Sequence, residues 1–171
     1  MSVLARRRAD RSKNLVGFTV DNVNYAIDIL LVREIIRPLE IVPIPHAPPA
    51  VLGVADHRGE VVPVLDMRRR FGLPPQAATR RTKWLIAAHA GRLVGLVIDS
   101  VTDVFGTADE EKRTVPHIGV GDAARGIRAV YSYDGKLVFV LDLSRIAAVT
   151  EMLDLGVAGA LLEQQQGRRP R

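Results

Sequence analysis

The stretch Gly59-Glu60-Val61-Val62-Pro63-Val64-Leu65-Asp66-Met67 recurs 76 residues later as Gly135-Lys136-Leu137-Val138-Phe139-Val140-Leu141-Asp142-Leu143. Both copies begin with glycine, continue as a run of mostly β-favouring residues and end with an aspartate before an apolar residue. The likeness extends upstream, where Gly53-Val54 corresponds to Ala129-Val130. Repetition on this scale indicates that one structural unit occurs twice in the chain.

A second pair of matches lies 69 residues apart and follows the same order in both halves. Tyr25-Ala26-Ile27 corresponds to Val94-Gly95-Leu96, and Val32-Arg33-Glu34-Ile35 corresponds to Val101-Thr102-Asp103-Val104. The shared order predicts two similar β-units of about 65 residues each, which would close as small barrels more readily than as one large sandwich. Neither unit would bury much apolar surface alone, so we expect them to pack together. Chance similarity between β-rich hairpins is the alternative.

Strands are predicted where β-favouring residues run between turn residues. They are Val16–Val20, Tyr25–Ile29, Val61–Leu65, Trp84–His89, Leu93–Ile98, Ala129–Tyr133 and Leu137–Leu141. Turn chemistry at Asp21–Asn24, His89–Arg92 and Asp134-Gly135 predicts hairpins between successive strands. Pro63 has no N–H to donate, so its strand should lie at a sheet edge or leave that position unpaired.

Helix is expected to be scarce. Asp66–Phe71 predicts one or two turns that end at Gly72. Ser144 predicts the cap of a C-terminal helix that runs from Arg145 onward and is interrupted at Gly156. The segment from Thr107 to Arg125 is expected to be an irregular loop that could hold one helical turn.

Composition narrows the class of protein. The 171 residues are 47% hydrophobic and 25% charged, an ordinary balance for a globular chain. The sequence has no cysteine, which excludes disulfides, thiolate catalysis and cysteine zinc sites. No apolar stretch approaches the roughly 18 residues that cross a bilayer, and residues 1–13 lack the apolar run of a signal peptide. The protein is therefore expected to be cytoplasmic.

The net charge of +5 belongs to the two ends of the chain. Residues 1–13 contain five basic side chains and residues 163–171 contain three, with one acid in each segment, which leaves 16 basic and 17 acidic residues in the body. A nucleic-acid-binding domain would carry its basic charge on the folded body, so none is expected. We expect a disordered basic tail over residues 1–13 and a helical extension with a basic tail over residues 151–171. Weak binding of the tails to an anionic partner is the alternative.

The sequence contains no arrangement typical of catalysis or metal binding. The histidines, His46, His57, His89 and His117, lack zinc spacing, and no phosphate loop, dinucleotide motif or nucleophile turn occurs. In the polar run Asp56-His57-Arg58-Gly59-Glu60, an enzyme hypothesis would make His57 a general base oriented by a carboxylate. Neighbouring hairpin residues rarely point at each other, so an exposed loop is favoured. We predict no catalytic residue, no cofactor and no metal.

Three other features have structural and functional interpretations. Asp28, Asp66, Asp99 and Asp142 recur near predicted strand ends; capping explains them better than the paired carboxylates of a glycosidase, because Asp66 and Asp142 occupy equivalent repeat positions.

Arg68-Arg69-Arg70 predicts a solvated helix face, with an anion contact as the alternative. The stiff segments Ile41–Pro45 and Pro48-Pro49 would either pack between the units or form an apolar groove for a partner.

In a series of short motifs, the chain resembles the CheW-like domain family of chemotaxis coupling proteins. The resemblance covers residues 14–150 and rests on an ordered series of motifs. They are Tyr25–Ile29, Val32–Ile36, Pro43–Pro45 with Ala47–Pro49, Gly53-Val54, Arg58–Arg68, Phe71–Leu73, Gly95–Val104 and Gly135–Leu143.

The resemblance implies an all-β fold of two packed, small, five-stranded SH3-like barrels, with a C-terminal helix added after them. It implies a non-catalytic adaptor that binds the regulatory domain of a CheA-type histidine kinase and the cytoplasmic tip of a methyl-accepting receptor. The membrane would be reached only through the receptor. The resemblance implies protein binding at Ile29, Val32, Glu34, Ile35, Arg58, Gly59, Val101 and Val104. We add Asp56 and His57 to this set because they directly precede Arg58.

One departure from the family pattern affects the expected partners. The family usually has Asn-Leu before the Arg-Gly pair, whereas this chain has Asp56-His57. The change adds a negative charge and a titratable ring beside Arg58. A diverged adaptor that binds only one partner is therefore an alternative. An enzyme on a double barrel, and nucleic-acid or acidic-lipid binding through the arginine tails, are more distant alternatives.

Overall fold

The fold consists of two β-sheets with a few short helices. The computed structural model describes residues 14–107, 111–114, 126–151, 153 and 155–167. The strands are β1 Leu15–Val20, β2 Val23–Asp28, β3 Val32–Ile36, β4 Val51–His57, β5 Glu60–Asp66, β6 Lys83–His89, β7 Arg92–Ile98, β8 Ser100–Phe105, β9 Lys112–Arg113, β10 Ile127–Tyr133 and β11 Lys136–Leu141. The helices are α2 Met67–Arg70, α4 Leu143–Ala147 and α5 Leu155–Gln166, with 3-10 turns η2 Ile29–Leu31 and η4 Ala148–Thr150.

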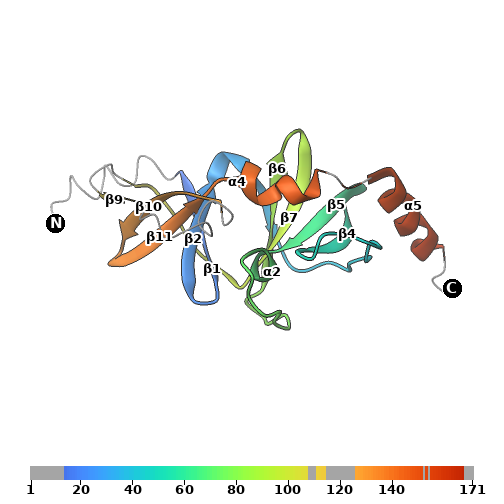
Figure 1. Cartoon of the computed structure of the whole chain (residues 1–171), viewed down its shortest axis with the longest axis horizontal. Helices are drawn as coiled ribbons and strands as arrows, with labels where there is room; N and C mark the ends of the chain where they lie inside the picture. The colour runs from blue at the N-terminus through green and yellow to red at the C-terminus, as the bar shows by residue number, and fades with distance from the viewer. Residues whose placement is uncertain (1–13, 108–110, 115–125, 152, 154, 168–171) are drawn as a thin grey trace.

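The two sheets have matching strand orders. Sheet A runs β8-β1-β2-β11-β10-β9, and sheet B runs β3-β6-β7-β5-β4. In each sheet a parallel pair, β2 with β11 or β7 with β5, lies between antiparallel pairs. The sheets lie at opposite ends of the elongated molecule, with α2 and α4 between them and α5 beyond β4 and β5 (Figure 1). The predicted all-β class is confirmed; the five strands expected of each unit are found in sheet B, and sheet A adds the short β9.

Each sheet takes strands from both halves of the sequence. Sheet B combines β3, β4 and β5 of the first half with β6 and β7 of the second, and sheet A combines β1 and β2 with β8 to β11. The repeat is therefore real, but the two sequence halves do not fold as two separate sheets. Strands β2 and β3 are joined through η2 across the two sheets, as β7 and β8 are joined through Asp99. The exchange makes each sheet depend on the other half of the chain.

Irregularities in the sheets recur at equivalent positions of the repeat. The β3–β6 register shifts between Val32 and Glu34, and the β8–β1 register shifts at the corresponding place between Val101 and Val104. The β4–β5 register shifts between Val51 and Gly53, and the β10–β11 register shifts 76 residues later, between Ile127 and Ala129. Matching bulges indicate a duplicated unit, because a bulge re-aims a specific residue and is not required by strand pairing in general.

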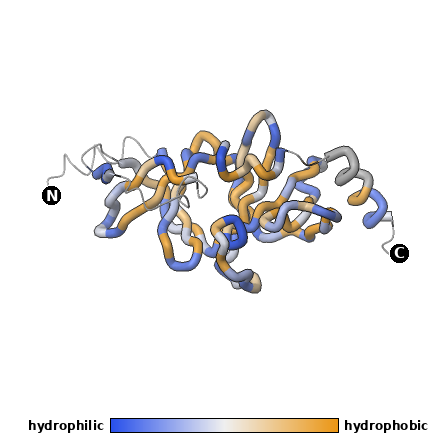
Figure 2. The backbone as a smooth tube through the Cα atoms, in the orientation of Figure 1, coloured by the Kyte–Doolittle hydropathy of each residue, from blue (hydrophilic) through white to orange (hydrophobic). Residues whose placement is uncertain are grey.

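A single apolar core joins the two sheets. It contains Val16, Phe18 and Ile27 from sheet A, and Leu85, Leu96 and Ile98 from sheet B, together with residues of both short helices. The Tyr25 ring stacks on Phe71, just after α2, with centroids 4.8 Å apart. Figure 2 shows hydrophilic residues gathered on the hairpin turns and α2 and hydrophobic residues along the strands. Burial of fully enclosed side chains, about 1.5–3 kcal/mol each, therefore stabilises both sheets together.

Two equivalent aspartates begin the short helices, as the repeat predicted. Asp66 accepts the Arg68 N–H at 3.0 Å and Asp142 accepts the Ser144 N–H at 2.9 Å. The prediction that Ser144 is the cap is wrong, because Asp142 stands one residue before α4 and Ser144 donates to it. The pKa of Asp142 is lowered by the Ser144 hydroxyl, whereas burial raises the pKa of Asp66. Equivalent positions thus differ because only Asp66 is enclosed.

The predicted strands and hairpin turns are confirmed within a few residues at their ends. The structure adds β3, β4, β8 and β9, which the sequence patterns did not predict as strands. Of the two arrangements expected for the Pro63 strand, the sheet edge is wrong, because β5 lies between β7 and β4; Pro63 itself lies outside the stretch Val64–Asp66 that pairs with β7. Gly156 does not interrupt the C-terminal helix, because it lies inside α5. Residues 1–13, 108–110, 115–125 and 168–171, including His117 and both basic tails, lie outside the described residues.

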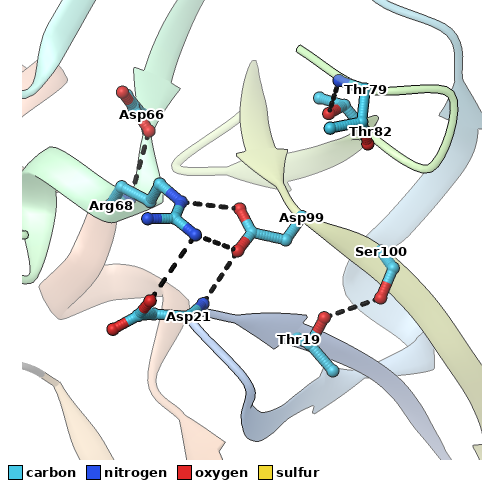
Figure 3. Close-up of polar contacts among 8 residues, drawn as sticks. All are labelled: Thr19, Asp21, Asp66, Arg68, Thr79, Thr82, Asp99 and Ser100. Atoms are coloured by element: carbon cyan, nitrogen blue, oxygen red, sulfur yellow. Dashed lines mark hydrogen bonds and ion pairs between the residues drawn. The ribbon is translucent and has the colours of Figure 1, made fainter. Parts of the chain in front are cut away.

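Arg68 joins the sheets at the crossing from β7 to β8 (Figure 3). Its Nε and Nη2 donate to Asp99 Oδ1 and Oδ2 over 3.0 and 2.7 Å, and Nη2 lies 3.6 Å from Asp21 Oδ1 in the β1–β2 turn. Asp99 also accepts the Asp21 N–H at 2.8 Å. The hydrogen bond to Asp99 raises the pKa of Arg68 above its usual value. A bidentate pair of this kind fixes direction as well as distance.

The solvated face expected of the arginine run is confirmed only for Arg69. The Arg68 side chain is 15% exposed and the Arg69 side chain 43%. Arg70 donates to the carbonyl oxygens of Arg145 and Ile146 at 3.3 Å each, which links α2 to α4. Arg68 and Arg70 therefore hold parts of the chain together, whereas Arg69 makes longer contacts, to the Pro49 carbonyl oxygen at 3.5 Å and to Asp66 at 3.6 Å.

Replacement of Gly53 by alanine should destabilise the fold strongly. A Cβ at Gly53 would lie 2.1 Å from the Val42 carbonyl oxygen, and the backbone φ is +146°. We expect a loss of roughly 2–4 kcal/mol in the free energy of unfolding, measured by urea denaturation with Trp84 fluorescence. Gly91→Ala is the matched control, because its φ is also positive but its Cβ would meet open space. Equal losses in the two variants would contradict the close approach of Val42.

Replacement of Arg68 by alanine should also weaken the fold, because Asp99 would keep its charge without the guanidinium. We expect a loss of about 1–2 kcal/mol in the same denaturation measurement, a modest value because the pair is partly solvated. Arg37→Ala, at an exposed arginine outside this pair, should change stability by less than about 0.5 kcal/mol. A similar effect of both substitutions would show that Arg68 does not join the sheets.

Candidate protein-binding surfaces

A charged cluster lies where the β4–β5 hairpin meets strand β3. The Arg58 Nη2 donates to Glu34 Oε1 at 2.7 Å, and His57 Nε2 lies 3.3 Å from Glu34 Oε2. The His57 side chain is 11% exposed, whereas that of Arg58 is 74% exposed. We refer to Glu34, His57 and Arg58 as the Arg58 cluster. The Arg58 guanidinium is exposed to solvent, and the Glu34 carboxylate contacts both Arg58 and His57.

The turn that carries Arg58 is fixed by local geometry. Arg58 and Gly59 form the two-residue link between β4 and β5, with φ values of +52° and +84°. Two successive positive φ values are typical of the type I′ hairpin turn, in which glycine is favoured at the second position. Asp56 Oδ1 accepts the Gly59 N–H at 2.8 Å. Side chain and backbone together hold Arg58 at the tip of the hairpin.

The Arg58 cluster connects the two edge strands of sheet B. Strand β3 is at one edge and β4 at the other, yet Glu34 reaches His57 and Arg58 directly. Sheet A has an equivalent contact, in which the Tyr133 hydroxyl donates to Asp103 Oδ2 at 3.1 Å. Burial, followed by the hydrogen bond to Asp103, raises the pKa of Tyr133. The contact in sheet B therefore links its two edge strands, and the contact in sheet A links edge strand β8 to β10, the strand next to the other edge.

The second candidate surface consists of four aliphatic residues that share one apolar core as their support. Ile29, Val32, Val101 and Val104 are half-buried, and all four pack against the core shared by the sheets. Val32 on β3 and Val101 on β8 occupy equivalent positions of the repeat, and each strand lies at one edge of its sheet. We refer to these four residues as the aliphatic strip. Ile35 is exposed, and it follows Glu34 on β3, so β3 contributes to both surfaces.

The cavity between the sheets is lined by other residues. It has a volume of about 580 Å³ and is bordered by the Arg68–Asp99 pair, the segment from Gln76 to Thr79, and Trp84. None of the predicted protein-binding residues lines it. Ile29, Val101 and Val104, which the resemblance implies as binding residues, therefore lie outside this cavity.

Sequence reasoning missed three features near these surfaces. Leu30, in η2 beside Ile29, is 86% exposed, and its position follows from Asp28, which accepts the Leu30 N–H. Tyr133 and Asp103 form the counterpart of the Arg58 cluster, which the repeat offsets could have indicated. Gln166 Nε2, on α5, donates to Asp56 Oδ2 at 3.2 Å. This last contact had no sequence signal.

The geometry bears on the enzyme hypothesis. His57 meets Glu34 and not its neighbour Asp56, and neither His57 nor Glu34 lines the inter-sheet cavity. Within the described residues, no group of three or more histidine, cysteine or acidic side chains could hold a metal ion. In the same part of the chain, no helix is both long and apolar enough to span a membrane. The arrangement offers charge and apolar area for binding.

Comparison with known proteins gives a consistent result. The CheW-like domain family matches residues 14–151. The chain is 30% identical over 146 residues to the chemotaxis protein CheW of Rhizobium meliloti, covering 85% of this chain and 94% of the relative. It is 27% identical over 134 residues to CheW of Bacillus subtilis, covering 78% and 86% respectively.

A solved structure agrees with the sequence relatives. The crystal structure of the scaffolding protein TtCheW from Thermoanaerobacter tengcongensis matches with a TM-score of 0.71 and 25% identity, covering 77% of this chain and 90% of that one. The order of motifs, the paired sheets and these matches lead to one conclusion: the chain belongs to the CheW-like domain family.

Proposed function

We propose that this protein is a cytoplasmic, non-catalytic adaptor that couples a methyl-accepting chemoreceptor to a CheA-type histidine kinase. The observation that carries the proposal is the presence of two chemically different surfaces on one body, joined by strand β3. One is the charged Arg58 cluster and the other is the aliphatic strip. A scaffold needs separate surfaces for separate partners and a rigid connection between them.

The Arg58 cluster suits the regulatory domain of the kinase. Arg58 is exposed but pre-oriented by Glu34, so its guanidinium can form directed hydrogen bonds with little loss of side-chain freedom. Exposed arginines of this kind are frequent hot spots of protein interfaces. Asp56, Gly59 and Ile35 surround the cluster and would complete this surface.

The aliphatic strip suits the helical tip of a receptor. Apolar side chains at the edge of a packed core accept the apolar face of an amphipathic helix, because burial of that face supplies the binding free energy. Exposed Leu30, next to Ile29, would extend the strip. Val101 and Val104 from sheet A would meet the same helix as Ile29 and Val32.

A diverged adaptor that binds a single partner is the second candidate. It is favoured by Asp56 and His57, because the resemblance implies Asn-Leu at these two positions before Arg58. Calorimetric titration of the protein against each partner separately distinguishes the two candidates. Saturable binding of both the kinase regulatory domain and a receptor tip fragment supports the coupling adaptor, and binding of only one supports the diverged form.

The Arg58→Ala variant should remain folded and bind the kinase regulatory domain about tenfold or more weakly, since it removes an exposed anchor but no core contact. Isothermal titration calorimetry measures the affinity, and circular dichroism confirms the fold. Arg128→Ala, at an exposed arginine on sheet A, is the matched control. Unchanged affinity of the Arg58 variant would remove the cluster from the kinase surface.

The Val101→Ala variant should weaken receptor binding while kinase binding stays the same. The substitution removes half-buried apolar area from the strip, so we expect about a threefold or larger loss of affinity for the receptor tip fragment. Both affinities are measured on one preparation. Loss of affinity for both partners, or for neither, would contradict separate surfaces.

A further inference from the structure

The C-terminal helix α5 lies on the outer side of the hairpin that carries Arg58. Leu162 is buried there with Val42 and Val54, and Leu161, Ile44 and Val61 pack around them. Figure 1 places α5 at the end of the molecule beyond β4 and β5. The stiff segment Ile41–Pro45 therefore serves as the seat of a helix, and the tip of the hairpin lies next to the last turn of that helix.

A chain of hydrogen bonds runs from α5 to the exposed guanidinium. Gln166 Nε2 donates to one oxygen of Asp56, and the other oxygen accepts the Gly59 N–H. Arg58 and Gly59 form the hairpin turn, and Arg58 donates a hydrogen bond to Glu34. Asp56 thus has each of its two oxygens engaged, one by the helix and one by the turn.

We propose that α5 is part of the kinase-binding surface, in which Gln166 acts through Asp56 to position the Arg58 turn. This inference rests on the proposed function of the Arg58 cluster. Asp56 and Gln166 lie 110 residues apart in the sequence, and their contact links α5 to the turn. The partner is the kinase regulatory domain, and the helix contributes by fixing the turn before the partner arrives.

Leu162 keeps the helix in place. Among residues 161–167, Leu162 is the only buried side chain, so its loss should loosen this end of the helix, on which the Gln166 contact depends. A pre-positioned turn binds more tightly than a mobile one, since less conformational freedom is lost on association.

The test reverses the donor and the acceptor in the hydrogen bond between Gln166 on α5 and Asp56 on β4. Gln166→Glu places a second carboxylate against Asp56, and it should weaken binding of the kinase regulatory domain about threefold or more in calorimetry. The double variant Asp56→Asn with Gln166→Glu restores a donor opposite an acceptor and keeps the oxygen that accepts from Gly59. It should bind within about twofold of Asp56→Asn alone. Gln164→Ala, at an exposed glutamine of the same helix, is the control.

Hydrogen exchange of the Gly59 amide gives a second readout. Gln166→Glu and Leu162→Ala should both increase the exchange rate of this amide without lowering the melting temperature by more than a few degrees. Weakened binding without rescue in the double variant, or unchanged binding and exchange in Gln166→Glu, would overturn the proposal. If the unmodified protein did not bind the kinase domain, both this inference and the proposed kinase surface would fall. If Arg58→Ala weakened binding but Gln166→Glu did not, only the role of α5 would fall.

Discussion

Burial of one apolar core between two sheets, each built from both halves of the chain, is the constraint on which the rest of this structure depends. Because β2 leads into β3 across the two sheets and β7 leads into β8 the other way, neither sheet can form without strands from the other half. The Arg68–Asp99 pair stands at one of these crossings and fixes the path of the chain there. The short helices α2 and α4, equivalent in the repeat, are linked by Arg70 and close the core between the sheets.

The same constraint places the binding surfaces. Strands β3 and β8 follow directly after the crossings, so they lie at edges of their sheets beside the shared core. Their inner residues are half-buried and form the aliphatic strip that we propose as a docking surface. The bulges at equivalent places in β3 and β8 change which side chains turn toward the core. A surface made in this way is rigid, because its supports are the core residues themselves.

The charged surface has a different origin. It depends on a two-residue turn at the tip of a hairpin, where backbone strain is tolerated and side chains are free to meet a partner. Glu34 holds the cluster across the opening between the sheet edges. Asp56 and His57 both have partners within the molecule: His57 meets Glu34, and Asp56 meets Gly59 and α5. Asp56 thereby connects the hairpin to α5, which lies beyond the residues that the family model matches.

The sequence by itself determined the strands with clear periodicity, the hairpin turns, the capping aspartates and the duplication, because each of these depends on residues close together in the chain. It also indicated Arg58 and the Val32–Ile35 segment as binding residues through resemblance. Only the tertiary structure decided that the halves exchange strands, that Pro63 lies in an interior strand, that His57 pairs with Glu34, and that Gln166 reaches Asp56. Each of these requires residues 20 or more positions apart to meet, and such contacts are set by packing of the shared core, which no local pattern of residues records.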